Sequence, residues 1–256
     1  MSPRRSQPSP PSTIAWHDGL SPVPDAQTLR PAGRTVTSHP SQDEFWQAVA
    51  EVQAGMAEQR ELRPELTLEE EPPPRRLAPQ AYAIGATISA SATQSAAYAG
   101  GNRSGTPGAG TDAEIGWGKF VLLFDAAGQP GWDGKHRIIS YVRAELEPEM
   151  AADPLINGVG WSWLTEALDA RSGGYRKISG TVTTVVTQGF GSKQDEPIAT
   201  GFELRASWSP LLCAGASAEL DGHVAAWCDV MYMAAGLPPL APGIAPLRPQ
   251  RRRPRQ

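Results

Sequence analysis

The segment from residue 143 to residue 168 places the tightest constraint on how this chain can fold. Its first half reads Arg-Ala-Glu-Leu-Glu-Pro-Glu-Met, and Pro148 has no N–H with which to continue a strand ladder. Asp153 and Pro154 have the form of a helix cap followed by proline at the first helical position. The segment therefore predicts a strand that ends near Pro148 and a helix that begins just after Asp153.

Elsewhere the apolar residues follow the two-residue period of strands or the 3.6-residue period of helices. The clearest strand has Ile198, Phe202 and Trp208 on one side and Glu203 and Arg205 on the other. The predicted order is helix, three strands, helix, two strands, helix. The strands are expected at residues 82–88, 117–124, 137–147, 181–190 and 198–208, and the helices at residues 41–63, 161–168 and 220–235.

Consecutive strands without helices between them predict an α+β fold. We expect a mostly antiparallel five-stranded sheet with helices packed on its apolar face. Residues 69–76, acidic and rich in proline, are expected to be a connector. The predicted organisation is a disordered Pro/Ser-rich arm (1–40), a single domain (41–240) with a low-complexity loop insertion (95–111), and a disordered Arg/Pro-rich tail (241–256).

The net charge of −4 conceals a more acidic body, because five arginines lie within the last nine residues and leave −9 for the rest. Binding to a phosphate backbone depends on Lys and Arg that displace counterions, so the acidic body argues against nucleic acid as a partner. The Arg-rich tail leaves weak contact with RNA open, although a solvated terminus is the commoner explanation. We therefore expect an unidentified protein partner.

Two cysteines, Cys213 and Cys228, form no CxxC pair, which predicts neither a disulfide framework nor a zinc knuckle. The N-terminus lacks the apolar centre of a secretory signal, and no apolar run approaches the roughly 20 residues of a membrane span. These features predict a soluble, cytoplasmic protein that does not associate with membranes.

The acidic segment suggests two alternatives. Glu145 and Glu147 would share one strand face, where their carboxylates could bind Mg²⁺ or Mn²⁺ and, with Asp153, support a metal-dependent phosphodiester hydrolase. Alternatively, the glutamates are solvated or pair with Arg143 and Arg205 across the sheet, and Asp153 is only a helix cap. We favour the second alternative and predict no catalytic residue, no metal and no cofactor.

Tryptophans suggest a further alternative. Trp161 and Trp163 point to different faces of their helix, so Trp163 is expected in the core and Trp161 at a surface or pocket. A small-ligand binding domain would have a pocket beneath Trp161 and Trp208, although packing alone explains tryptophan in such a core. The candidate functional surface combines the acidic segment with these neighbours: Arg143, Glu145, Glu147, Glu149, Asp153, Trp161 and Arg205.

Several motifs together resemble one family. They include the run already quoted from residue 143, Val-Gly-Trp-Ser-Trp-Leu from residue 159, and Arg-Ala-Ser-Trp-Ser-Pro from residue 205. From about residue 45 to residue 240 the chain resembles an actinobacterial family of unknown function, the domain of unknown function 3000. It differs from that family in the 95–111 insertion and at Gly158, where a better helix former is expected. The family has no established activity, so the resemblance implies no site residue.

These observations favour a non-enzymatic interaction or regulatory domain. Its working surface would be the polar face of the sheet and the edge between Glu145 and Trp161. The metal-dependent hydrolase and the small-ligand binding domain remain the alternatives.

Overall fold

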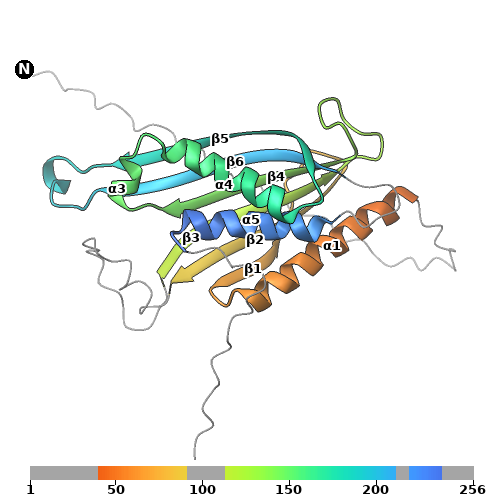
Figure 1. Cartoon of the computed structure of the whole chain (residues 1–256), viewed down its shortest axis with the longest axis horizontal. Coiled ribbons are helices and arrows are strands. Elements are labelled where there is room, and N and C mark those ends of the chain that lie inside the picture. The colour runs from red at the N-terminus through yellow and green to blue at the C-terminus, as the bar shows by residue number, and fades with distance from the viewer. Residues whose placement is uncertain (1–39, 91–112, 212–218, 238–256) are drawn as a thin grey trace, which may run out of the picture. The chain divides into compact units, whose positions relative to one another are not determined.

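A computed structural model describes residues 40–90, 113–211 and 219–237. These residues form one six-stranded antiparallel sheet in the order β1-β2-β3-β4-β6-β5, together with helices (Figure 1). The elements are α1 (Pro40–Leu62), β1 (Leu66–Glu71), β2 (Gln80–Ala90), β3 (Ala113–Phe124), β4 (His136–Glu145), α3 (Pro148–Ala151), α4 (Ile156–Arg171), β5 (Tyr175–Thr187), η1 (Gly191–Lys193), β6 (Ala199–Pro210) and α5 (Leu220–Ala234). The predicted α+β class with an antiparallel sheet is confirmed.

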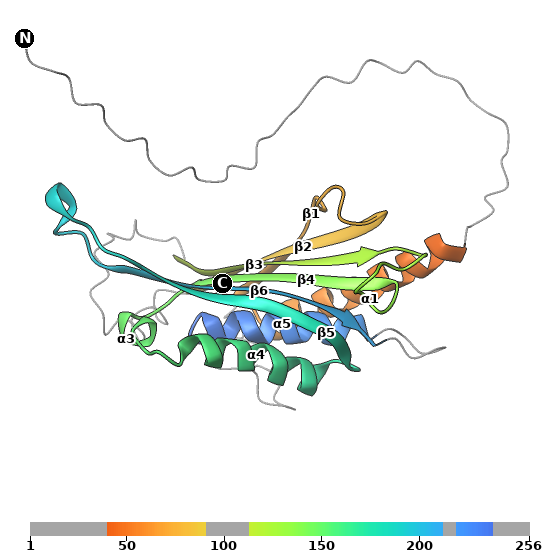
Figure 2. The ribbon, with the colours of Figure 1, turned by 90° about the horizontal axis from the view of Figure 1, so that it is seen from above.

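Helices α1, α4 and α5 lie on one side of the sheet, as Figure 2 shows. Residues of β4 alternate between this helix side and the opposite side, and His136, Ile138, Val142 and Ala144 are buried. Gly118 of β3 allows α5 to approach closely, because a Cβ there would lie 2.7 Å from the Met231 sulfur. The main core therefore fills the space between the helices and one face of the sheet, which we call the helix face.

The prediction of five strands was wrong by one strand. β1 spans Leu66–Glu71, so its second half lies in residues 69–76, which were expected to be an acidic connector. It pairs antiparallel with β2. Leu66 and Leu68 are buried in the core and the residue between them is exposed. Three consecutive glutamates follow, so the two-residue period of this strand is too short to be recognised in the sequence. The six-stranded sheet consequently ends at β1 on one edge and at β5 on the other.

Element boundaries also differ from the prediction around Pro148. The strand ends at Glu145, and Glu147 becomes the N-cap of the short helix α3 rather than a strand residue. Asp153 does not cap α4, which begins at Ile156; its Oδ1 accepts a hydrogen bond from the backbone N–H of Leu155 in the preceding turn. β5 begins six residues before its predicted start and ends at Thr187.

The predicted arm (1–40), insertion (95–111) and tail (241–256) lie almost entirely outside the described residues, as does Cys213. Cys228 is a buried free thiol on α5, and its burial raises the pKa of the thiol to about 12. No helix in the described part of the chain is long and apolar enough to cross a membrane.

Two histidines are buried in the core in their neutral form. Trp208 is fully buried, as predicted, and its Nε1–H donates to Nδ1 of His223 at 3.1 Å, so this nitrogen must carry no proton. Both ring nitrogens of His136, on β4, lack a hydrogen-bond partner among the described residues, and its ring lies 4.8 Å from that of Phe124. Burial lowers the pKa of His136 and of His223 to about 4.

These histidines should make the fold sensitive to mild acid. In the unfolded chain each imidazole titrates near its ordinary pKa of 6.5, so below that pH the unfolded state binds more protons than the folded state. Stability should therefore be complete above pH 6.5 and fall as the pH is lowered towards 4, by on the order of 3 kcal/mol for each histidine. Urea unfolding between pH 7 and pH 5 measures this loss.

The His223→Gln variant provides the control for that measurement. Glutamine does not titrate, so its unfolding free energy should decline less steeply over the same pH range, whatever its stability at pH 7. Equal slopes for the wild type and the variant would contradict the assignment of a neutral, buried His223.

Candidate functional site

Polar and aromatic side chains form two rows across the face of the sheet that is opposite the helices, here called the open face. Because residues directly opposite each other in an antiparallel sheet point to the same side, the strand registers define each row. One row consists of Glu69, Gly85, Lys119, Tyr141, Arg205 and Thr181, and the next consists of Thr67, Thr87, Trp117, Arg143, Glu203 and Thr183. Each row crosses all six strands.

Tyr141 is at the centre of this surface. Its ring makes an edge-on contact with Trp117, with the ring centroids 5.2 Å apart, and the Arg205 guanidinium lies 5.4 Å from its centroid. Arg205 also pairs with Glu203 at 3.2 Å. Partial burial, followed by the negative charge of Glu203, raises the pKa of Tyr141, so the phenol remains protonated at neutral pH. The aromatic rings and the arginine are thus held in place before any partner binds.

A hollow of ≈270 Å³ lies beside this cluster and is lined by Thr67, Glu69, Gly85 and Thr87. The Glu71 side chain lies over Gly85, where a Cβ would collide with its carboxylate, and Glu71 pairs with Lys119 of β3 with N···O at 2.6 Å. The adjoining row of the open face is different, because Ala83, Val121 and Ile139 are packed beneath Ala78 and Trp132. Loops therefore cover one part of the open face, and no described element covers the two polar rows.

The structure brings together some of the residues predicted as a functional surface. Arg143, Glu145 and Arg205 lie on the open face, on β4 and its neighbour β6, as the alternation in the sequence predicted. Arg205 pairs with Glu203, a residue of its own strand that was not among the partners proposed from the sequence. Arg143 is directly opposite Glu203 in the register.

The remaining predicted residues lie elsewhere. Glu147 and Glu149 are exposed at the start of α3, and Asp153 is exposed in the turn before α4. Trp161 lies on the other side of the sheet from Arg143, since a Cβ on Gly180 of β5 would point to its ring at 2.9 Å. Trp161 packs against the main core but is only partly buried, and Trp163 is likewise partly buried with its ring 5.6 Å from that of Phe202. The predicted site is therefore divided between the two faces.

The described residues form neither the metal site of the hydrolase alternative nor the pocket beneath Trp161 and Trp208 of the ligand-binding alternative. Within residues 40–90, 113–211 and 219–237, no three His, Cys, Asp or Glu side chains form a group that could hold a metal ion. Trp208 is fully buried and cannot line an open pocket. A second hollow of ≈140 Å³, lined by Glu44, Lys135, His136, Arg176 and their neighbours, does not include Trp161 either.

Trp117, Tyr141 and Glu203 belong to the site but were absent from the predicted surface. The alternation of β4 does place Tyr141 on the polar face, but the aromatic contact with Trp117 depends on the register between β3 and β4. That register joins residues far apart in the sequence, so the pattern within one strand does not reveal it. One sequence signal could have placed Trp117 on the open face. It lies an odd number of residues from Phe120 and Leu122 in the same strand, so its side chain points to the face opposite these two buried residues.

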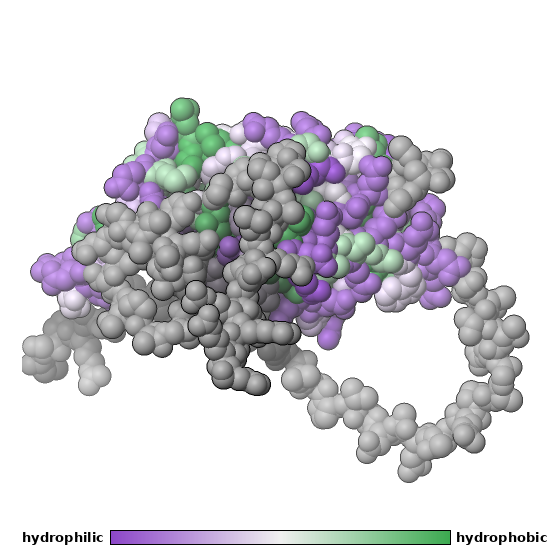
Figure 3. All heavy atoms as spheres, turned by 60° about the horizontal axis from the view of Figure 1, so that its bottom comes forward, coloured by the Kyte–Doolittle hydropathy of each residue, from purple (hydrophilic) through white to green (hydrophobic). Residues whose placement is uncertain are grey.

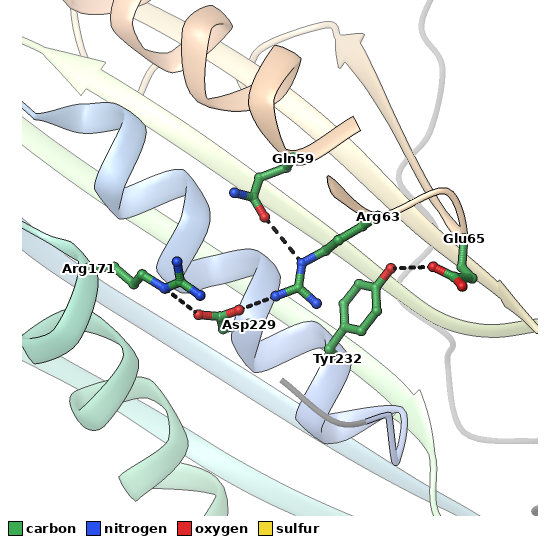
Figure 4. A network of polar contacts seen from close by, with 6 residues as sticks. All are labelled: Gln59, Arg63, Glu65, Arg171, Asp229 and Tyr232. Atoms are coloured by element: carbon green, nitrogen blue, oxygen red, sulfur yellow. Dashed lines mark hydrogen bonds and ion pairs between the residues drawn. The ribbon is translucent and has the colours of Figure 1, made fainter. Parts of the chain in front are cut away.

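A second polar cluster is buried among the helices (Figure 4). Asp229 of α5 accepts hydrogen bonds from Arg63, which follows α1, and from Nε of Arg171, at 2.8 Å, at the end of α4. The Arg63 guanidinium lies 3.9 Å from the ring centroid of Tyr232, whose hydroxyl donates to Glu65 at 3.2 Å. Because Arg63 and Asp229 are almost completely buried, this cluster is suited to joining three helices and not to binding a ligand from solution.

Comparison with known proteins identifies a family but no activity. The model of a family described as "Protein of unknown function (DUF3000)" matches residues 41–245. No curated protein and no solved structure matches the chain.

The acidic segment gives a test of the hydrolase alternative. Since Glu145, Glu147 and Asp153 do not form a metal-binding group, Mg²⁺ and Mn²⁺ should leave the thermal midpoint of the protein unchanged at equal ionic strength. Differential scanning fluorimetry of the wild type and of the Glu145→Gln/Glu147→Gln variant makes the comparison. A saturable rise of the midpoint that the double variant lacks would support metal binding instead.

Proposed function

The chain belongs to the DUF3000 family of proteins of unknown function, so we infer its function from its own geometry. We propose that it is a protein-interaction domain that binds its partner on the two polar rows of the open face. This role is non-enzymatic, either as an adaptor or as a regulator. The observation that carries the proposal is the cluster of Trp117, Tyr141, Arg143 and Arg205 on the part of the open face that no described residues cover.

The composition of this cluster supports the proposal. Tryptophan, tyrosine and arginine are the residues that most often contribute the largest part of the binding energy at protein interfaces. Their mutual contacts restrict the side chains before binding, which lowers the entropy lost when the complex forms. The hollow beside them, between Thr67, Glu69 and Thr87, offers space for one anchoring side chain of the partner.

The charges of the surface also support a protein partner over a nucleic acid. Arg205 is paired with Glu203, and Lys119 is paired with Glu71, so two of the cations on this face are already neutralised. A surface that binds a phosphate backbone instead presents cations free to displace its counterions. The partner that fits this face has a mixed polar and aromatic surface.

The proposal is tested by affinity capture with the tagged protein from lysates of its source cells, followed by binding measurements with the captured partner. Arg143→Glu should weaken binding roughly thirtyfold or more, as loss of about 2 kcal/mol at an interface hot spot does. Lys193→Glu, which makes the same charge change at the exposed η1 turn, is the matched control and should bind like the wild type.

Arg143→Glu, Lys193→Glu and a further variant, Tyr141→Ala, must first show wild-type circular dichroism and thermal midpoints. If Arg143→Glu and Tyr141→Ala then bind the partner as tightly as the wild type does, the open face is not the binding surface. Binding that is weakened by Lys193→Glu to the same extent would point to a general effect of charge.

A further inference from the structure

The two edges of the sheet are formed by strands of different character. β1 is six residues long and ends in three glutamates, and both features discourage an edge strand from pairing with another chain. Figure 3, in which the α1 and β1 side comes forward, shows hydrophilic side chains predominating over the described part of that surface. β5 spans 13 residues and contains no charged residue and no proline from Ile178 to Thr187. β5 therefore lacks the features that protect β1.

The outer side of β5 presents backbone hydrogen-bonding groups that no described strand pairs with. β5 pairs only with β6 among the described strands, and Figure 1 shows it at the margin of the sheet. Its pairing is regular from Ser179 to Thr187, so every second residue there directs its N–H and C=O away from β6. Several side chains along this stretch are exposed, including Thr181, Thr183 and Val186. This is a regular, accessible template for one more strand.

We propose that β5 pairs antiparallel with β5 of a second copy of this chain, about a two-fold axis at Thr183, joining two six-stranded sheets into one. The strand is complementary to itself in this register. Thr181 is opposite Val185 of the second copy, and Ser179 is opposite its Thr187, so no like charges meet and β-branched side chains face each other. A closed two-fold contact of this kind uses the same surface on both copies.

The side chains on the helix face fit the same register. Gly180 would be opposite Val186 of the second copy, and the Trp161 ring lies over Gly180. Val186 is 59% exposed in the single chain, and Trp161 is only partly buried. Pairing would place the exposed valine of one copy beside the tryptophan of the other, which removes apolar surface of both from water.

The charges at the ends of the paired stretch are complementary as well. Lys177 precedes the uncharged stretch and makes no ion pair with a described residue. The opposite end leads to the β5–β6 turn, where Lys193 pairs with Glu196 at 3.3 Å and Asp195 makes no ion pair with a described residue. In an antiparallel arrangement, Lys177 of each copy lies towards the turn that carries Asp195 of the other. This complementarity favours a second copy over an unrelated peptide as the occupant.

Light scattering coupled to size exclusion tests the proposal on the full chain. The wild type should have twice the chain mass of 27.3 kDa at high concentration and dissociate on dilution. Thr183→Lys and Thr183→Glu each place like charges opposite each other at the axis, so each variant alone should be monomeric. An equimolar mixture of the two variants should recover the dimer, because opposite charges then meet at that position.

Thr67→Lys is the matched control, since Thr67 is an exposed threonine on the other edge strand, and it should remain dimeric. A wild type that is monomeric at every concentration would overturn the proposal, as would a dimer that persists in both single variants. Slow exchange of the alternate amides between Ser179 and Thr187 that point away from β6, in a monomeric wild type, would show that a segment of the same chain covers the edge, which also contradicts pairing with a second copy.

Discussion

The buried carboxylate of Asp229 is the interaction on which the arrangement of the helices depends. It binds the guanidinium of Arg63, which is 1% exposed, and that of Arg171, so one side chain of α5 is bound to the ends of α1 and α4. A buried cation without a partner costs several kcal/mol, so Arg63 can remain in the core only where Asp229 is within reach. This requirement fixes the ends of α1 and α4 to α5 on one face of the sheet, whereas apolar packing alone tolerates small shifts.

With the helices on one face, the opposite face and one edge of the sheet are left for other molecules. The open face carries the cluster around Tyr141, whose contacts with Trp117 and Arg205 cross three neighbouring strands. β5, which carries no charged residue from Ile178 to Thr187, is the edge strand at one end of the same sheet. The two polar rows end on β5 at Thr181 and Thr183, so pairing of a second copy at this edge would continue both rows across two sheets.

The sequence was informative where the signal lies within one element. Alternation along the strand that precedes Pro148 correctly placed Arg143 and Glu145 on the polar face, and Trp208 was correctly placed in the core. β1 was missed because its glutamates outnumber its two buried leucines. Asp229 and Arg63 are 166 residues apart, and no local pattern joins them. Trp161 was grouped with Arg143 because they are near in sequence, but α4 carries it over the other face of the sheet.

Urea unfolding of two variants tests the role of Asp229 most directly. Asp229→Leu leaves Arg63 buried without its anion and should lower the free energy of unfolding by about 3–5 kcal/mol. Arg63→Met combined with Asp229→Leu removes both buried charges, leaves the partly exposed Arg171 to solvent, and should recover most of that loss. If Asp229→Leu is within roughly 1 kcal/mol of the wild type, as for an exposed ion pair, the helices do not depend on this interaction.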